Sequence, residues 1–197
     1  MNKEMGPEGD KARRKPRADS LRNREKLLSA AAEVFREGGP EASLEAVARR
    51  AGVGIGTLYR HFPTRDALFE GVYRRDVDAL AEMAERLAAE LPPGEALRRW
   101  LHCAIDVIAV KKGMLEALAL ATEGKQELFS YSKCRMNAGA EALIGRAVAA
   151  GEIRADVVPD DLWHAVIGFC AMRGQPGWRE RAGRLVDIFA DGLSAAL

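Results

Sequence analysis

The sequence predicts an all-α protein, and three observations carry this prediction. Apolar residues recur at spacings of three and four along most of the chain, and no stretch alternates with period two for long enough to form a strand. Glycine and proline bound several of these periodic stretches. The 197 residues are 48% hydrophobic and 30% charged with a formal net charge of +1, a globular balance that excludes disordered and collagen-like classes.

The first predicted helix opens at Asp19 or Ser20 and ends at residues 38–40, Gly-Gly-Pro. Its apolar face is formed by Leu27, Leu28, Ala31, Val34 and Phe35. A second helix of about two turns follows, with Ser43 as its N-cap and Gly52 as its left-handed end. The third helix spans residues 55–62 and stops at Pro63.

Thr64 caps the fourth predicted helix, which persists to the Pro92-Pro93 pair. Its length of roughly 26 residues corresponds to about 40 Å, long enough to join two bodies. Five further helices bring the predicted set to about nine. They lie near residues 97–108, 114–123, 126–150, 160–173 and 178–196.

Charge is distributed unevenly along the chain. Residues 1–75 contain 16 Lys and Arg against 11 Asp and Glu, whereas residues 76–197 contain 14 against 18. The excess is greatest in residues 11–65, with 13 against 6. Such a segment is expected to bind a polyanion such as nucleic acid. The alternative is that it forms a basic surface exposed to solvent.

Residues 43–62 pair two short helices through a glycine turn, the layout of a helix-turn-helix that presents its second helix to the major groove. Ser43-Leu44 and Val47-Ala48 lead into the stretch AGVGIGTLYRHFPTRDAL at residues 51–68. These residues resemble the head of the TetR family of bacterial transcriptional regulators, over residues 20–80. The resemblance implies a homodimeric DNA-binding protein, usually a repressor, with a variable all-α body that often binds a small effector. Residues 1–19 lack the apolar core of a secretory signal, which predicts a cytoplasmic protein.

The composition of the N-terminus and this resemblance together divide the chain into three segments. Residues 1–19 are expected to form a disordered basic tail, residues 20–80 a TetR-type DNA-binding domain, and residues 81–197 an effector-binding and dimerisation domain. The tail is similar to arms that some DNA-binding proteins lay in a minor groove, although a merely solvated arm is the alternative.

Several residues around the turn are candidates for DNA contact. They are Ser43, Gly54, Ile55, Thr57, Tyr59, Arg60, His61 and Arg65. Hydroxyl and imidazole donors of the third helix resemble the family's phosphate contacts, with Ser43 and Arg65 as further backbone contacts. Arg60 is the candidate for a base contact, because guanidinium bonds guanine O6 and N7 together; a phosphate or solvent role is the alternative.

The turn departs from the family pattern at two positions. Gly54 and Ile55 stand where a small hydroxyl and a polar or basic residue are common, so the third helix lacks a side-chain cap. Ile55 either meets a thymine methyl group or packs inward. Tyr59 is either a phosphate contact or a packing residue, whereas Leu58 and Phe62 are expected to be core.

The body offers two further sets of candidates. A ligand pocket is predicted from aromatic, methionine and polar residues, the alternative being ordinary core with a solvated His-Asp pair. The pocket candidates are Met83, Trp100, His102, Asp106, Met114, Phe129, Met136 and Trp163. Surplus apolar residues on the last two helices predict a twofold dimer interface. The interface candidates are Ile167, Phe169, Cys170, Leu185, Ile188, Phe189 and Leu193.

Other classes of function find little support. The chain has no GxSxG, P-loop or HExxH motif and three histidines, so neither catalysis nor a metal or cofactor is expected. The three cysteines form no CxxC pair, and no apolar run approaches the roughly 20 residues that span a membrane. The expected partners are an operator in double-stranded DNA, a second copy and a small apolar effector. The remaining alternative is a helical interaction module whose basic head binds a protein or an anionic surface.

Overall fold

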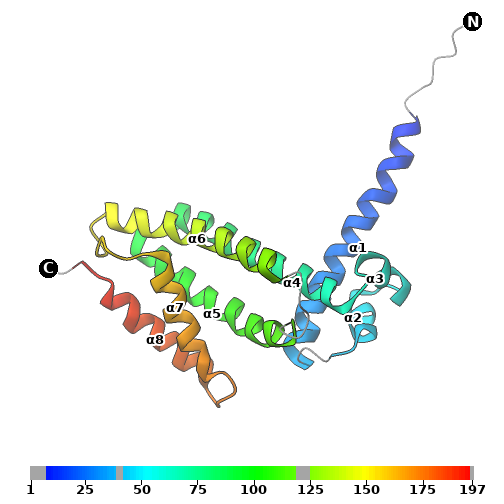
Figure 1. The fold of residues 1–197 in the computed structure, drawn as a ribbon. Coiled ribbons are helices and arrows are strands. Elements are labelled where there is room, and N and C mark those ends of the chain that lie inside the picture. The colour runs from blue at the N-terminus through cyan, green and yellow to red at the C-terminus, as the bar shows by residue number, and fades with distance from the viewer. Residues whose placement is uncertain (1–7, 39–41, 119–124, 196–197) are drawn as a thin grey trace, which may run out of the picture. The chain divides into compact units, whose positions relative to one another are not determined.

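The computed structural model describes residues 8–38, 42–118 and 125–195. Over these residues it contains eight α-helices, one 3-10 turn and no β-strand. The only β-type pairing among them is an isolated bridge between Ile153 and Ser194. The all-α prediction is confirmed. The chain divides into two compact units, residues 1–72 and 73–197 (Figure 1).

The first unit is built from three helices and the start of a fourth. They are α1 (Glu8–Gly38), α2 (Leu44–Ala51), α3 (Ile55–His61) and α4 (Arg65–Glu90). The rings of Phe35 and Phe69 stack with centroids 4.3 Å apart in its core. A Cβ atom added at Gly71 would lie 2.9 Å from both Leu28 and Phe62, so α4 approaches its neighbours closely at this residue.

Local capping fixes the short helices of this unit. The Ser43 hydroxyl accepts a hydrogen bond from the Ala46 amide at 3.0 Å, and Gly52 has the left-handed conformation with φ of 68° that ends α2. Thr64 caps α4 in the same way, through the Ala67 amide. The predicted boundaries of α2, α3 and α4 therefore agree with the structure to within one or two residues.

The first helix differs from its prediction. Residues 1–19 were expected to be a disordered tail, yet α1 extends back to Glu8, and residues 1–7 lie outside the described part. The added turns are rich in Lys, Arg and Ala, which have high helix propensity, and Pro16 does not end the helix.

The second unit contains the rest of α4 and four further helices. They are α5 (Pro93–Leu118), α6 (Lys125–Ala149), α7 (Pro159–Phe169) and α8 (Trp178–Gly192), with the 3-10 turn η1 (Cys170–Met172) after α7. Helix α5 packs against α6, α7 and α8, and Trp100 in its first third is fully buried. Gly151, with φ of 70°, follows α6 as its predicted left-handed end.

One predicted break in this unit is wrong. The sequence suggested separate helices on either side of Gly113, but α5 continues through it to Leu118. A single glycine costs a helix only about 1 kcal/mol relative to alanine, so it does not force an end. Residues 119–124, which include the remainder of the predicted 114–123 helix, lie outside the described residues.

Candidate nucleic-acid interface

Helix α3 has one buried side and one exposed side. Leu58 and Phe62 are buried against the rest of the first unit, as predicted for core residues. The guanidinium of Arg24 lies over the Phe62 ring, 4.9 Å from its centre, and covers this side from α1. The opposite side exposes Tyr59, with 46% of its surface accessible, and Arg60. The short helix is thus fixed by its apolar residues and presents polar ones.

The N-terminus of α3 is open. A Cβ atom added at Gly54 or Gly56 would meet no atom within 4 Å, and Gly54 caps the helix without a side-chain hydrogen bond. Ile55 between them is 38% exposed, which places it at the surface rather than in the core. Thr57 and His61 are half-buried along the same short helix.

Two arginines hold the neighbouring elements in place. Arg50 of α2 donates hydrogen bonds to Glu33 and Glu37 of α1, each at 3.0 Å, and the bond to Glu37 holds the pKa of that carboxyl below its ordinary value. Arg65 donates to the carbonyl oxygen of Ala42 at 2.8 Å. Arg65 therefore ties the start of α4 to the residue before the Ser43 cap, in addition to any contact with DNA.

The sequence did not identify Arg24 or Arg50, or the structural role of Arg65. Their three hydrogen bonds and one cation–π contact join residues 13 to 38 positions apart in the sequence. Helical periodicity reports only which face of one helix is apolar, so no local signal could have paired them.

The predicted ligand-pocket residues separate into two groups. Trp100 and Trp163 meet edge to face at 5.1 Å, and their indole nitrogens donate to the Leu80 carbonyl and the Asn137 side chain, each at 2.8 Å. Met136 is also buried in this unit, and Met83 is half-buried. Phe129 is 47% exposed, and the side chain of Met114 lies outside those that the structure describes.

The two polar members of the predicted pocket bond to α8 instead. His102 Nε2 lies 2.8 Å from Asp187 Oδ1, and Asp106 pairs with Arg179. The bond to His102, together with Arg98, holds the pKa of Asp187 below its ordinary value. This arrangement differs from the expectation that His102 and Asp106 face a cavity, because both side chains bond to residues of α8.

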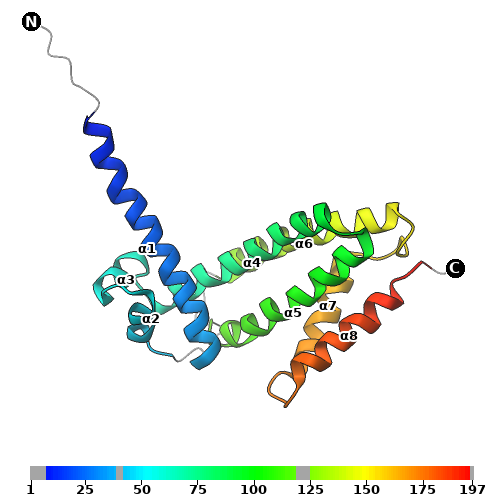
Figure 2. The ribbon, with the colours of Figure 1, turned by 180° about the vertical axis from the view of Figure 1, so that it is seen from behind.

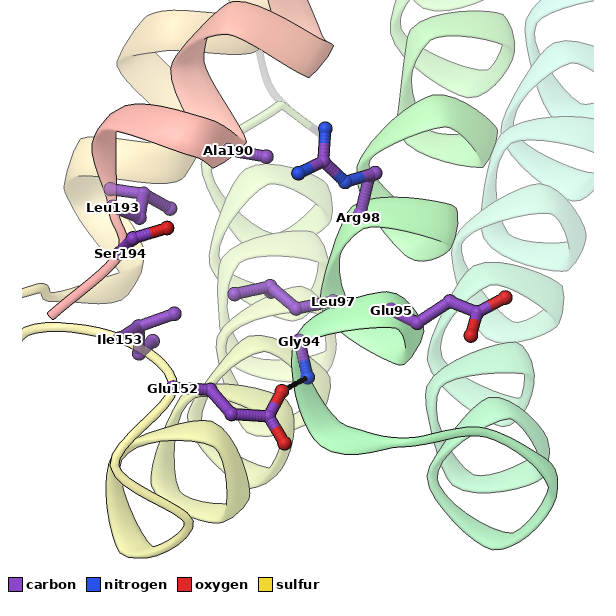
Figure 3. Close-up of a pocket in the computed structure, with 9 residues that line it drawn as sticks. All are labelled: Gly94, Glu95, Leu97, Arg98, Glu152, Ile153, Ala190, Leu193 and Ser194. Atoms are coloured by element: carbon purple, nitrogen blue, oxygen red, sulfur yellow. Dashed lines mark hydrogen bonds between the residues drawn. The ribbon is translucent and has the colours of Figure 1, made fainter.

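A small pocket lies elsewhere in the second unit, where the start of α5 meets the end of α8 (Figure 3). It has a volume of about 270 Å³. Glu152 accepts a hydrogen bond from the Gly94 amide at 2.6 Å across its mouth. None of the predicted pocket residues lines it. The lining residues are Gly94, Glu95, Leu97, Arg98, Glu152, Ile153, Ala190, Leu193 and Ser194.

The predicted dimer residues are partly exposed. Ile167 of α7 is 50% exposed and Ile188 of α8 is 68% exposed. Phe169 and Phe189 are half-buried and meet edge to face with centroids 6.0 Å apart, and Leu185 is also half-buried. Cys170 and Leu193 are corrections to the predicted set, because both are buried within the chain and have little surface left for a second copy.

Among the residues that the structure describes, no group of three or more His, Cys, Asp or Glu side chains could hold a metal ion. No described helix combines the length and the apolar character that crossing a membrane requires.

Comparison with known proteins identifies the family of both units. Residues 27–72 match the family model described as bacterial regulatory proteins, tetR family, and residues 92–195 match the model of the SbtR-like transcriptional regulator C-terminal domain. An HTH-type transcriptional regulator of Staphylococcus aureus strain USA300 is 40% identical over 63 residues, which are 32% of this chain and 34% of that protein. The chain thus matches about a third of the length of this curated relative.

Two solved structures extend the similarity to nearly the whole chain. A TetR transcriptional regulator from Streptomyces coelicolor is 44% identical with a TM-score of 0.79, covering 88% of this chain and 99% of that one. A TetR transcription regulatory protein from Mycobacterium vanbaalenii is 31% identical with a TM-score of 0.73, covering 90% and 98%. With one family model spanning more than half of its residues, this chain belongs to the TetR family of DNA-binding transcriptional regulators, which are not enzymes.

Proposed function

We propose that this regulator is a homodimeric repressor that binds a palindromic operator and leaves it when a small apolar effector binds. The observation that carries the proposal is the two-sided α3, with Leu58 and Phe62 buried and Tyr59 and Arg60 exposed. A reading helix needs a fixed backbone and outward side chains, and α3 has both. We place its action in the cytoplasm, where bacterial DNA is accessible.

The exposed residues of the head are proposed to form two groups, one that contacts bases and one that contacts phosphates. Arg60 is proposed to read guanine, and Ile55 to contact a thymine methyl group at the open end of α3. Phosphate contacts fix the register without reading sequence. The remaining candidates are assigned to the backbone of the DNA: Ser43, Gly54, Thr57, Tyr59, His61 and Arg65.

The dimer is proposed to form through α7 and α8. Ile167 and Ile188 are apolar side chains with half or more of their surface exposed, on two helices that pack against each other. Phe169, Leu185 and Phe189 have the remaining accessible surface of the predicted set. Association through the same face of both copies buries these residues twice and gives a twofold axis, which matches a palindromic operator.

The effector is proposed to bind in the core of the second unit, beside Trp100, Met136 and Trp163. These buried side chains supply an apolar surface with two indole groups, and Met136 is a flexible residue that can make room. His102 and Asp106 bond to α8, so the proposal does not assign them to this role.

The deciding experiment compares the full chain on fragments of its own upstream intergenic DNA and on scrambled duplexes at one fixed salt concentration. The mass of each complex is recorded in the same experiment. A preference of roughly a thousandfold, with two or four chains per fragment, is the expected result. Equal weak binding to both DNAs would refute a specific repressor, and one chain per fragment would refute the dimer.

A further inference from the structure

Helix α3 is too short to hold its own direction. It has seven residues, and a helix of this length is marginal in water without tertiary contacts. Two buried side chains anchor it, Leu58 within the helix and Phe62 directly after its last residue. What surrounds these two anchors therefore sets the direction of α3 and the place of the exposed Arg60.

Phe62 anchors the C-terminal end of α3. Its amide donates a hydrogen bond to the Leu58 carbonyl oxygen at 2.8 Å, and its backbone is extended, with φ of −136° and ψ of 90°. Pro63 disfavours helical geometry at the preceding residue, so the helix does not continue past this point. Because the Phe62 ring is attached directly to the last turn of α3, a displaced ring would displace that turn.

The Phe62 ring is enclosed by two other helices of the same unit. Helix α4 comes so close that a Cβ atom added at Gly71 would lie 2.9 Å from Phe62 Cε1 and from Leu28 Cδ2. Leu28 belongs to α1, as does Arg24, whose guanidinium carbon lies over the ring, 4.9 Å from its centre. Figure 2 shows α1 running past α2 and α3 within this unit. The ring thus meets α4 at its edge and Arg24 over its face.

Arg24 is the charged member of this enclosure. It is half-buried, and among the residues that the structure describes it pairs with no carboxylate. Arg50 and Arg65 differ, because they donate hydrogen bonds to oxygen atoms of neighbouring elements. A planar guanidinium covers an aromatic face in a way that a lysine ammonium does not reproduce. The interaction of Arg24 within the head is therefore its contact with the ring.

We propose that Arg24 is a positioning residue for DNA reading, a role that rests on the proposed DNA-binding function and deepens it. Arg24 holds the Phe62 ring, and the ring sets the direction of α3. A cation–π contact at a partly exposed site is worth a factor of about 2 to 5 in an equilibrium constant, which bounds the loss on its removal. Phosphate contacts carry no sequence information, so binding to random DNA is expected to persist.

The test compares the full chain with its Arg24→Lys variant, which keeps the charge and removes the planar group. Arg22→Lys is the matched control, because Arg22 lies on the same helix and pairs with the exposed Asp19 at 2.6 Å. Binding is measured on a duplex recovered by selection from a random-sequence pool and on a scrambled duplex, at one fixed salt concentration. Thermal unfolding reports whether the fold is retained, and hydrogen exchange at the Phe62 amide reports how firmly α3 is held.

We expect Arg24→Lys to lower the preference for the selected duplex by about 2- to 5-fold, while affinity for the scrambled duplex changes by less than about 1.5-fold. Exchange at the Phe62 amide should become faster by a similar factor, with the amides of α2 unchanged. Arg22→Lys should alter neither quantity. An unchanged preference in Arg24→Lys would overturn the proposal, and so would an equal loss in Arg22→Lys.

A double-mutant cycle separates positioning from direct contact with DNA. In a Phe62→Leu background the ring is absent, so Arg24→Lys should change the preference by less than about 1.5-fold. A loss of the same size in both backgrounds would show that Arg24 acts without the ring, and the proposal would fail. If selection yields no preferred duplex, the proposed function fails and the role of Arg24 with it. A preferred duplex that Arg24→Lys binds as selectively as the full chain would remove only the role of Arg24.

Discussion

The two units of this regulator use their polar side chains in opposite ways. On α3 of the first unit, Tyr59 and Arg60 are exposed at a surface that meets DNA in the proposed function. On α5 of the second unit, a polar row at i+4 spacing is bonded to α8. Arg98 pairs with Asp187 and Asp191, His102 with Asp187, and Asp106 with Arg179.

This difference shows what a polar row on a helix means. Exposed side chains are available to a partner, whereas paired ones join two helices of the same chain. Both helices carry polar side chains beside an apolar face, as the consecutive Tyr59 and Arg60 on α3 and the i+4 row of Arg98, His102 and Asp106 on α5. Only the elements packed around the helix decide between a binding surface and an internal ion-pair network.

The largest expected effect comes from the buried side of α3. Leu58→Ala should lower the free energy of unfolding by about 2–5 kcal/mol, because it leaves a cavity where a fully buried side chain stood. Its neighbour is the matched control: Tyr59→Ala should change that free energy by no more than about 0.5 kcal/mol while weakening DNA binding. Urea denaturation and fluorescence anisotropy measure the two effects. Similar stability losses in both variants would contradict the two-sided helix.

The proposed dimer surface of the second unit gives the next effect. Ile188→Glu should raise the dimer dissociation constant by about 100-fold, because a twofold interface would bury the unpaired carboxylate twice. Leu21→Glu is the control, since Leu21 is a similarly exposed residue on α1 of the first unit. Sedimentation velocity over a concentration series measures both. A dimer that tolerates Ile188→Glu would place the interface elsewhere.

A smaller effect distinguishes the proposed base contact of Arg60 from the proposed phosphate contact of Arg65. Arg60→Ala should reduce the preference for operator over scrambled DNA by about 1–3 kcal/mol. Arg65→Ala should weaken binding to both alike and lower the salt slope by about 0.9, with a stability loss of about 1 kcal/mol from the bond to Ala42. Titrations of both duplexes, with urea denaturation, test this. Equal losses on both duplexes for Arg60→Ala would remove it as the reader.

The smallest effect concerns pH. The pKa of Asp187 is held below its ordinary value of 3.8 by His102 and Arg98, so its charge stabilises the folded chain above that value. This contribution is lost as the pH falls through the lowered pKa, and at a half-exposed site it amounts to less than about 1 kcal/mol. Asp187→Asn should therefore lower stability at pH 6, and this loss should shrink as the pH falls below 3.8. Urea denaturation across pH 2–7 measures this, and a constant difference would contradict it.

Local chemistry explains which features were predictable. The Ser43 and Thr64 caps, the Gly52 turn and the apolar spacing of Leu58 and Phe62 act within a few residues, and the structure contains them as expected. The length of α1 and the continuity of α5 through Gly113 were missed. Both depend on helix propensities that differ by about 1 kcal/mol or less per residue. The spacing of apolar residues does not show whether a helix continues through such positions.

The sequence by itself determined the all-α class, the helix-turn-helix and the family, because periodicity, caps and turn residues are local and sum along the chain. Only the tertiary structure decided that His102 and Asp106 bond to α8, that Arg65 ties α4 to Ala42, and that Cys170 and Leu193 are buried. The bonds among these outcomes join segments 23 to 85 residues apart that come together when apolar faces are buried. The local sequence pattern shows which face of a helix is apolar. Tertiary packing decides which residues of other helices contact that face and the polar side chains beside it.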